Sequence, residues 1–142
     1  MTEPSRKLAG ILLIILPTVA YGGVTLLTML INAESGYAEN ALRQDLWRAG
    51  HAHAGVLLIL SLVILRYVDE ANLSEKVKRF VRTGTPTTAI LVPAAFFLSV
   101  LDPESSQPNN LIYLAYAGFA LLTVTLITLG IGLVRKRGPQ QG

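Results

Sequence analysis

The chain has 142 residues and a net charge of +3, and 51% of its residues are hydrophobic while 15% are charged. Its mean hydropathy of +0.50 is too high for a water-soluble domain of this size, so lipid must solvate much of the surface. The basic residues gather in short clusters at the ends of apolar runs, which argues against a nucleic-acid partner and indicates membrane anchoring. With no cysteine in the chain, disulfides, thiolate metal sites and Cys-ligated iron–sulfur clusters are excluded.

Four apolar runs predict transmembrane helices, because about 20 helical residues cross a hydrocarbon core of about 30 Å. The first run, residues 8–32, is long and uncharged. The second, residues 46–67, carries two histidines near its start, and the third, residues 85–101, is short and contains two prolines. The fourth, residues 111–134, is again long and uncharged. We therefore expect residues 1–142 to form a single membrane domain with four spans.

Polar segments before the two weaker spans predict helix beginnings. Residues 74–83 predict an amphipathic helix at the membrane surface, with the apolar residues Val77, Phe80 and Val81 toward lipid and the basic residues toward headgroups. The basic residues are Lys76, Lys78, Arg79 and Arg82. Thr85 and Pro86 are then expected as the N-cap and first residue of the third span. Before the second span, Glu39 and Arg43 have the i,i+4 spacing of a helical ion pair.

Lysines and arginines predict the orientation of the spans, because they are enriched in cytoplasmic loops. Of the basic residues, only Arg43 and Arg48 lie on the outer side, before and at the beginning of the second span. The others lie before the first span, between the second and third, or after the fourth: Arg6, Lys7, Arg66, Lys76, Lys78, Arg79, Arg82, Arg135, Lys136 and Arg137. We predict an all-α integral membrane four-helix bundle in the cytoplasmic membrane of a bacterium, with both termini cytoplasmic.

Both histidines of the chain lie near the outer end of the second span. His51 is about 22 Å along a helix from Arg66, which places its imidazole inside the outer part of the hydrocarbon core. Ionisable groups at that depth usually face protein or a polar cavity and mark functional sites. Residues two apart on a helix point about 200° away from each other, so His51 and His53 cannot share one metal on a regular helix. Of the two, we favour His51 as a ligand.

The other spans offer polar residues at a similar depth. A stripe on the first span is expected to face inward, and with tyrosines of the fourth span it would enclose a polar pocket in the outer half of the bundle. The stripe consists of Thr18, Tyr21, Thr25, Thr28 and Asn32, and the tyrosines are Tyr113 and Tyr116. The alternatives are helix-packing contacts for the threonines and ordinary interfacial anchoring for the tyrosines.

The His-Ala-His motif at residues 51–53, followed by small and apolar residues, resembles the helix that bears a low-spin haem ligand in the haem–copper oxidase and nitric-oxide reductase superfamily. The resemblance covers about ten residues. It implies that His51 or His53 ligates haem b, with Met29, Tyr116 or a group from another chain as the second axial ligand. Copper held by His51 and His53 is the metal alternative. The rest of the chain resembles small bacterial four-span membrane proteins.

No phosphate-binding loop, Ser-His-Asp set or HExxH motif occurs in the sequence. We therefore predict a non-catalytic membrane protein that works in the lipid bilayer as an accessory subunit of a larger membrane complex or as a homo-oligomer. Small residues of the second span, Gly50 and Ala54, are the expected assembly face. The alternative function is a haem- or copper-binding redox protein that uses the two histidines.

Overall fold

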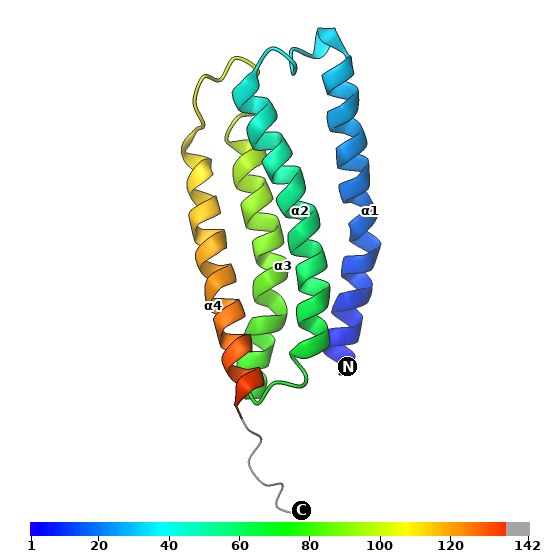
Figure 1. The fold of residues 1–142 in the computed structure, drawn as a ribbon, viewed down its shortest axis with the longest axis vertical. Helices are drawn as coiled ribbons and strands as arrows, with labels where there is room; N and C mark the ends of the chain where they lie inside the picture. Colours follow the sequence, from blue (N-terminus) through cyan, green and yellow to red (C-terminus); the bar gives the residue numbers. More distant parts are fainter. Residues whose placement is uncertain (136–142) are drawn as a thin grey trace, which may run out of the picture.

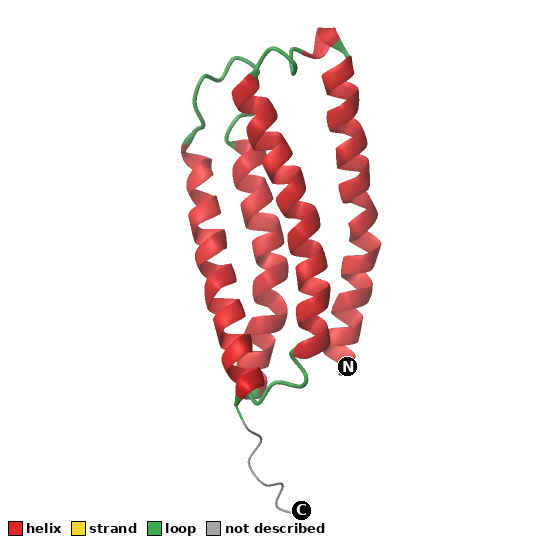
Figure 2. Cartoon of the chain, viewed as in Figure 1, coloured by secondary structure: helices red, strands yellow, loops and turns green. Residues whose placement is uncertain are grey.

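The computed structural model describes residues 1–135, which fold into four long helices and two short 3₁₀ turns. They are α1 (Glu3–Ile31), η1 (Ala33–Ser35), α2 (Ala41–Tyr67), α3 (Glu75–Leu98), η2 (Asn110–Tyr113) and α4 (Leu114–Val134). These residues contain no strand, which confirms the all-α prediction (Figure 2). The four long helices lie side by side: α1 contacts α2, and α3 packs against both α2 and α4 (Figure 1).

Three stretches are long and apolar enough to cross a membrane: Glu3–Ile31, Ala41–Tyr67 and Asn110–Val134. This finding agrees with an integral membrane protein. The remaining long helix, α3, is less apolar because its first turns carry the charged residues of the predicted surface segment. It is nevertheless deeply packed, with buried residues from Val81 to Ala95.

Helix α3 differs from its sequence-based description. Residues 74–83 and the third predicted span form one continuous helix, whose N-cap position is held by Ser74 and not by Thr85. Pro86 lies inside this helix, where it cannot donate a hydrogen bond to the carbonyl of Arg82. The helix continues because Thr85 and its neighbours are buried between α2 and α4, so tertiary packing outweighs the lost bond.

Small residues at intervals of seven bring α4 close to α3. Gly118, Thr125 and Gly132 are all buried on α4, and seven residues are about two helical turns, so they share one face. A Cβ atom added to Gly118 would lie 2.6 Å from Cγ2 of Val92. The close approach of the two helices therefore depends on the absence of a side chain there.

The termini and loops define the two ends of the molecule. The N-terminus, the α2–α3 loop and the end of α4 lie at one end, which we call the basic end because it holds the predicted cytoplasmic lysines and arginines (Figure 1). The α1–α2 and α3–α4 loops lie at the opposite end, where Nδ2 of Asn40 donates hydrogen bonds to the carbonyls of Pro103 and Ser105, at 2.8 and 3.1 Å. Lys136 and Arg137 of the predicted basic cluster lie outside the described residues.

Candidate functional site

His51 lies against the backbone of α1. A Cβ atom added to Gly23 would be 3.1 Å from both Cε1 and Nε2 of the imidazole, and one added to Gly22 would be 3.7 Å from Nδ1. Two consecutive glycines on α1 thus make room for the ring. No hydrogen bond joins the His51 side chain to any residue from 1 to 135. The Nε2 edge faces α1, so a metal or a porphyrin could not enter there without moving that helix.

His53 points to the other side of α2. Its ring lies 5.3 Å from the Phe96 ring on α3 and 5.6 Å from the Phe119 ring on α4, measured between centroids. Nδ1 is 2.7 Å from the carbonyl oxygen of Ala49. Because a carbonyl only accepts, Nδ1 is the donor in this contact, and in the neutral tautomer that makes it Nε2 carries the lone pair. Metal-ligating histidines commonly adopt this arrangement.

The space beside His53 does not fit haem within a single copy of the chain. The recess there has a volume of about 120 Å³ and is lined by Ala52, His53 and Val56. Pockets for drug-sized ligands and cofactors usually measure about 300–1,000 Å³. In residues 1–135 no three histidine, aspartate or glutamate side chains gather as a metal site would require.

The other two predicted ligands lie far apart from each other. Met29 is on α1, and Tyr116 is exposed on α4, where its ring stacks on Tyr113 at 6.1 Å. Figure 1 places α1 and α4 at opposite edges of the molecule. Of the cavities described here, one is lined by His53 and none by His51, Met29 or Tyr116. The structure therefore does not bring the four predicted ligands together.

The polar stripe of α1 faces outward, contrary to the prediction. Only Ser5 and Leu12 of this helix are buried. Leu12 and Tyr21 are separated by nine residues, about 900° of helical rotation, so Tyr21 lies on the face opposite to the packed one. The threonine hydroxyls of the stripe donate to carbonyls of their own helix, Thr18 to Ile15, Thr25 to Tyr21 and Thr28 to Val24. Tyr21 is 75% exposed, and its hydroxyl makes no hydrogen bond within the described part of the chain.

A cluster of Arg43, Trp47 and Phe97 lies at the end opposite to the basic end. The Arg43 guanidinium lies 4.2 Å from the centre of the Trp47 ring and donates to the carbonyl of Leu101 at 3.2 Å. Trp47 Nε1 donates to the carbonyl of Phe97 at 3.1 Å. Arg43 is thus a buried residue under Trp47 and not an ion-pair partner of Glu39, which precedes the first residue of α2. Its spacing of four from Trp47 is the signal that could have revealed the cluster.

Gly50 is also part of this cluster. A Cβ atom added to Gly50 would lie 3.0 Å from Cε2 of Phe97 and 3.2 Å from Cβ of Phe96. The glycine therefore allows α2 and α3 to pack within one chain, and a larger side chain there would disturb the fold before it disturbed an assembly. Nearby Tyr37 is buried, and this burial raises the pKa of its hydroxyl, while Arg48 and Arg43 oppose the rise.

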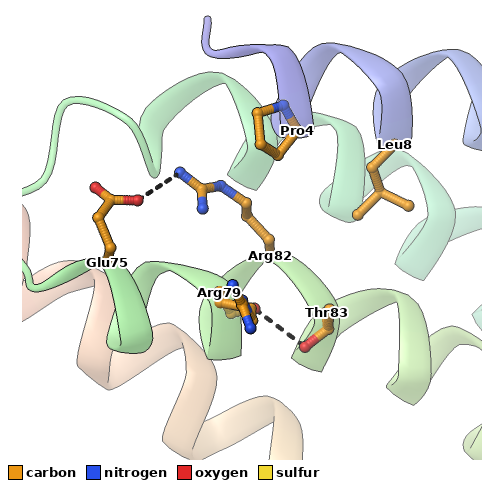
Figure 3. Close-up of a pocket in the computed structure, with 6 residues that line it drawn as sticks. All are labelled: Pro4, Leu8, Glu75, Arg79, Arg82 and Thr83. Atoms are coloured by element: carbon orange, nitrogen blue, oxygen red, sulfur yellow. Dashed lines mark hydrogen bonds and ion pairs between the residues drawn. The ribbon is translucent and has the colours of Figure 1, made fainter.

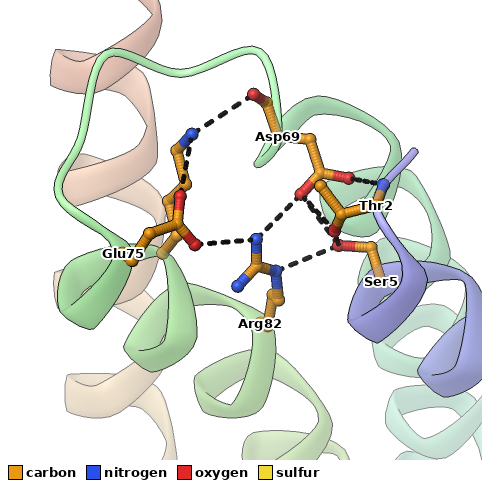
Figure 4. Close-up of polar contacts among 6 residues, drawn as sticks. Thr2, Ser5, Asp69, Glu75 and Arg82 are labelled. Carbon is orange, nitrogen blue, oxygen red and sulfur yellow. Dashed lines mark hydrogen bonds and ion pairs between the residues drawn. The ribbon is translucent and has the colours of Figure 1, made fainter.

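A buried ion pair organises the basic end (Figure 4). Arg82 on α3 donates to Oδ1 of Asp69 at 2.9 Å and to Oγ of Ser5 at 3.0 Å. The Asp69 carboxylate also accepts from the backbone N–H of Thr2 at 2.6 Å and from the hydroxyl of Ser5 at 3.0 Å. The network joins the N-terminus, the α2–α3 loop and α3. Sequence reasoning assigned Arg82 to headgroups and missed its partner, since Asp69 lies thirteen positions earlier.

The carboxylate of Asp69 is held in its charged form. Burial by itself would raise the pKa of Asp69, but hydrogen bonds from Thr2, Arg82 and Ser5 outweigh burial and lower the pKa to about 2. The side chains of Arg82 and Asp69 are 9% and 10% exposed. Such a pair costs desolvation energy and is retained where several further hydrogen bonds satisfy it.

Comparisons with known proteins give no relative. No family model matches the chain, and no curated protein or solved structure matches it either. The resemblance of the histidine motif to the haem–copper oxidase superfamily therefore stays a prediction.

Proposed function

We propose that this chain is a non-catalytic four-span membrane protein that assembles with further copies of itself through the outward polar stripe of α1. In this proposal the four helices form a bundle in a bacterial cytoplasmic membrane, with the basic end in the cytoplasm. The exposed hydroxyl of Tyr21 is the observation that carries the assembly.

Tyr21 lies at hydrocarbon depth when α1 spans the bilayer. The middle of α1 is Pro17, and four residues place Tyr21 about 6 Å from it along the axis. Half of the hydrocarbon core is about 15 Å thick, so the phenol has no water beside it. An unpaired hydroxyl in an apolar medium costs several kcal/mol relative to a paired one. A partner that pairs this group would therefore stabilise the protein in the membrane.

A second copy of the same stripe supplies suitable partners. Each threonine hydroxyl donates to its own helix, yet its oxygen keeps lone pairs that accept a further bond. The phenol of Tyr21 in one copy would donate to such an oxygen in the other. Hydrogen bonds between helices of this kind, together with the close packing of small residues, hold membrane helices together.

Length and charge support four spans. Helix α3 has 24 residues, and its uncharged part from Thr83 to Leu98 is about 24 Å long at 1.5 Å per residue, which covers most of a core of about 30 Å. Its charged residues occupy only the first turns, at the basic end, where Arg66 of α2 and Arg135 after α4 also lie. The excess of arginine and lysine at this end favours a cytoplasmic location.

Cysteine cross-linking in native membranes would test the assembly, because the chain contains no cysteine of its own. Thr25→Cys lies on the stripe, and Val24→Cys is the matched control at the same depth, about 100° away around the helix. We expect oxidation to give a covalent dimer with Thr25→Cys and little with Val24→Cys. Tyr21→Phe, which removes one oxygen atom, should lower the dimer yield at Thr25 several-fold.

Other cross-linking patterns would overturn this proposal. Equal yields at positions 24 and 25 would mean random collision between copies. A monomer at both positions would exclude self-assembly through this face and would leave an accessory role in a larger complex. Haem or copper ligation by His51 and His53 is the alternative function, and a reduced-minus-oxidised spectrum with metal analysis of the purified protein would test it.

A further inference from the structure

Two adjoining hollows between α1 and α3 form a groove on the surface of the molecule. At the basic end its wall is polar and is lined by Pro4, Leu8, Glu75, Arg79, Arg82 and Thr83, which enclose about 330 Å³ (Figure 3). Pro4 and Leu8 come from α1, and the other four come from α3.

Further along α1 the groove becomes apolar. A second hollow of about 360 Å³ is lined by residues of α1 and α3, with Ala54 and Leu58 of α2 as its floor. Leu8 lines both hollows, so the polar and apolar parts adjoin each other at this residue. Ile15 and Ile90 at the rim are exposed, and the groove is therefore open to lipid where the helices span the bilayer.

The polar part of the groove contains one more basic side chain than the carboxylates can pair. Glu75 lies 3.5 Å from Lys78 and 3.6 Å from Arg82, and Asp69 pairs with Arg82. These two carboxylates thus balance Lys78 and Arg82. Arg79 has an exposed side chain that makes no ion pair or hydrogen bond with any other residue in the described range. The mouth of the groove consequently carries a net charge of about +1, which suits one phosphate diester.

The dimensions of the apolar part fit one acyl chain. From Leu8 to Val19 the groove follows α1 for eleven residues, about 16 Å of helix. One leaflet of the hydrocarbon core is about 15 Å thick. The groove begins at the level of the arginines and ends near the middle of the bilayer.

We propose that this groove binds one anionic phospholipid, with its phosphate on Arg79 and one acyl chain lying between α1 and α3 over Ala54. A lipid explains both halves of the groove together, whereas a soluble phosphate compound would use only the polar half. The inference rests on the proposed membrane location, but it does not depend on self-assembly: of the stripe residues only Thr18 lines the groove, and Tyr21 and Thr25 do not.

Thermal unfolding of the purified protein in a neutral detergent tests the proposal. The probes are phosphatidylglycerol, phosphatidylcholine and glycerol 3-phosphate, each added over a range of concentrations. We expect phosphatidylglycerol alone to raise the melting temperature. Arg79→Gln should require about tenfold more of this lipid for half of the effect, because it removes a hydrogen bond between two charged groups. Lys76→Gln is the matched control, since Lys76 is an exposed cation on the same helix that does not line the groove.

Three results would overturn the proposal. Equal stabilisation by phosphatidylcholine would show that the headgroup charge is not recognised, and full stabilisation by glycerol 3-phosphate would indicate a soluble ligand. An unchanged response of Arg79→Gln would remove Arg79 from the site. The mass of the protein in the same detergent samples reports assembly separately, so a failure of the lipid proposal is distinguishable from a failure of self-assembly.

Discussion

Asp69 couples the stability of the basic end to pH. Its pKa is lowered to about 2, from about 4 in an unfolded chain. A depressed pKa gives stability that is complete above about pH 5 and is lost as the pH falls towards 2, and here the loss amounts to about 2 kcal/mol. We expect unfolding in detergent to show this loss between pH 5 and pH 2, and Asp69→Asn to abolish most of it.

The control for this experiment is Glu104→Gln, which changes an exposed carboxylate at the other end of the molecule. This variant should keep the pH dependence of the wild type. An Asp69→Asn protein that loses as much stability on acidification as the wild type would show that the Asp69–Arg82 pair is not the source of the effect.

At the same scale, periodicity predicts the directions of the histidines but not their surroundings. His51 and His53 contact different helices, as residues two apart on a helix must. The glycines against His51 and the phenylalanines against His53 depend on which helices pack together, and the spacing within α2 carries no such information. The preference for His51 as a ligand stays a prediction, while the free Nε2 supports His53.

At the scale of helices, the stripe on α1 shows why periodic polarity alone does not define an inner face. Threonines can satisfy their hydroxyls on the carbonyls of their own helix, so a row of them does not require a polar neighbour. The sequence predicted the row correctly and its direction wrongly. Tyr21 cannot reach its own backbone in this way, and its exposed hydroxyl is the observation behind the proposed assembly.

Helix α3 shows a second limit of local reasoning. Pro86 after a threonine is typical of a helix beginning, and the break predicted there was wrong. The helix continues because residues on both sides of Pro86 are buried against α2 and α4. Contacts between distant residues decided this boundary, and a rule based on adjacent residues cannot include them.

The packing of α3 on α4 leads to a prediction at the same scale. Gly118→Ala would push a methyl group into Val92 and should destabilise the protein by about 1–3 kcal/mol. Gly130→Ala, on the same helix, meets nothing within 4 Å and should be neutral or stabilising by up to about 1 kcal/mol. Chemical unfolding in detergent would compare the two variants. Equal effects at both positions would show that Gly118 is not a contact point.

At the scale of the whole molecule, composition and the length of the apolar runs were enough to predict an all-helical chain with membrane-crossing stretches. Three helical stretches of the described residues are long and apolar enough to cross a membrane. The arrangement of the four helices in chain order, with α1 packed mainly against α2, could not be predicted, because each apolar run is compatible with several neighbours in lipid. The ion pair between Asp69 and Arg82 at the basic end could not be predicted either, because the fold brings these two residues together.

The proposed topology requires that α3 crosses the membrane. If it does, the chain has four spans and both termini lie on the same side; if it does not, the chain has three spans and the termini lie on opposite sides. Accessibility to an impermeant thiol reagent in intact cells measures this directly, because the natural chain has no cysteine. Single cysteines would replace Ala33 in the α1–α2 loop, Ser74 in the α2–α3 loop, Ser106 in the α3–α4 loop and Gln140. We predict labelling of Ala33→Cys and Ser106→Cys from outside, and labelling of Ser74→Cys and Gln140→Cys only after the cells are opened. Protection of Ser106→Cys together with labelling of Gln140→Cys from outside would contradict the four-span account.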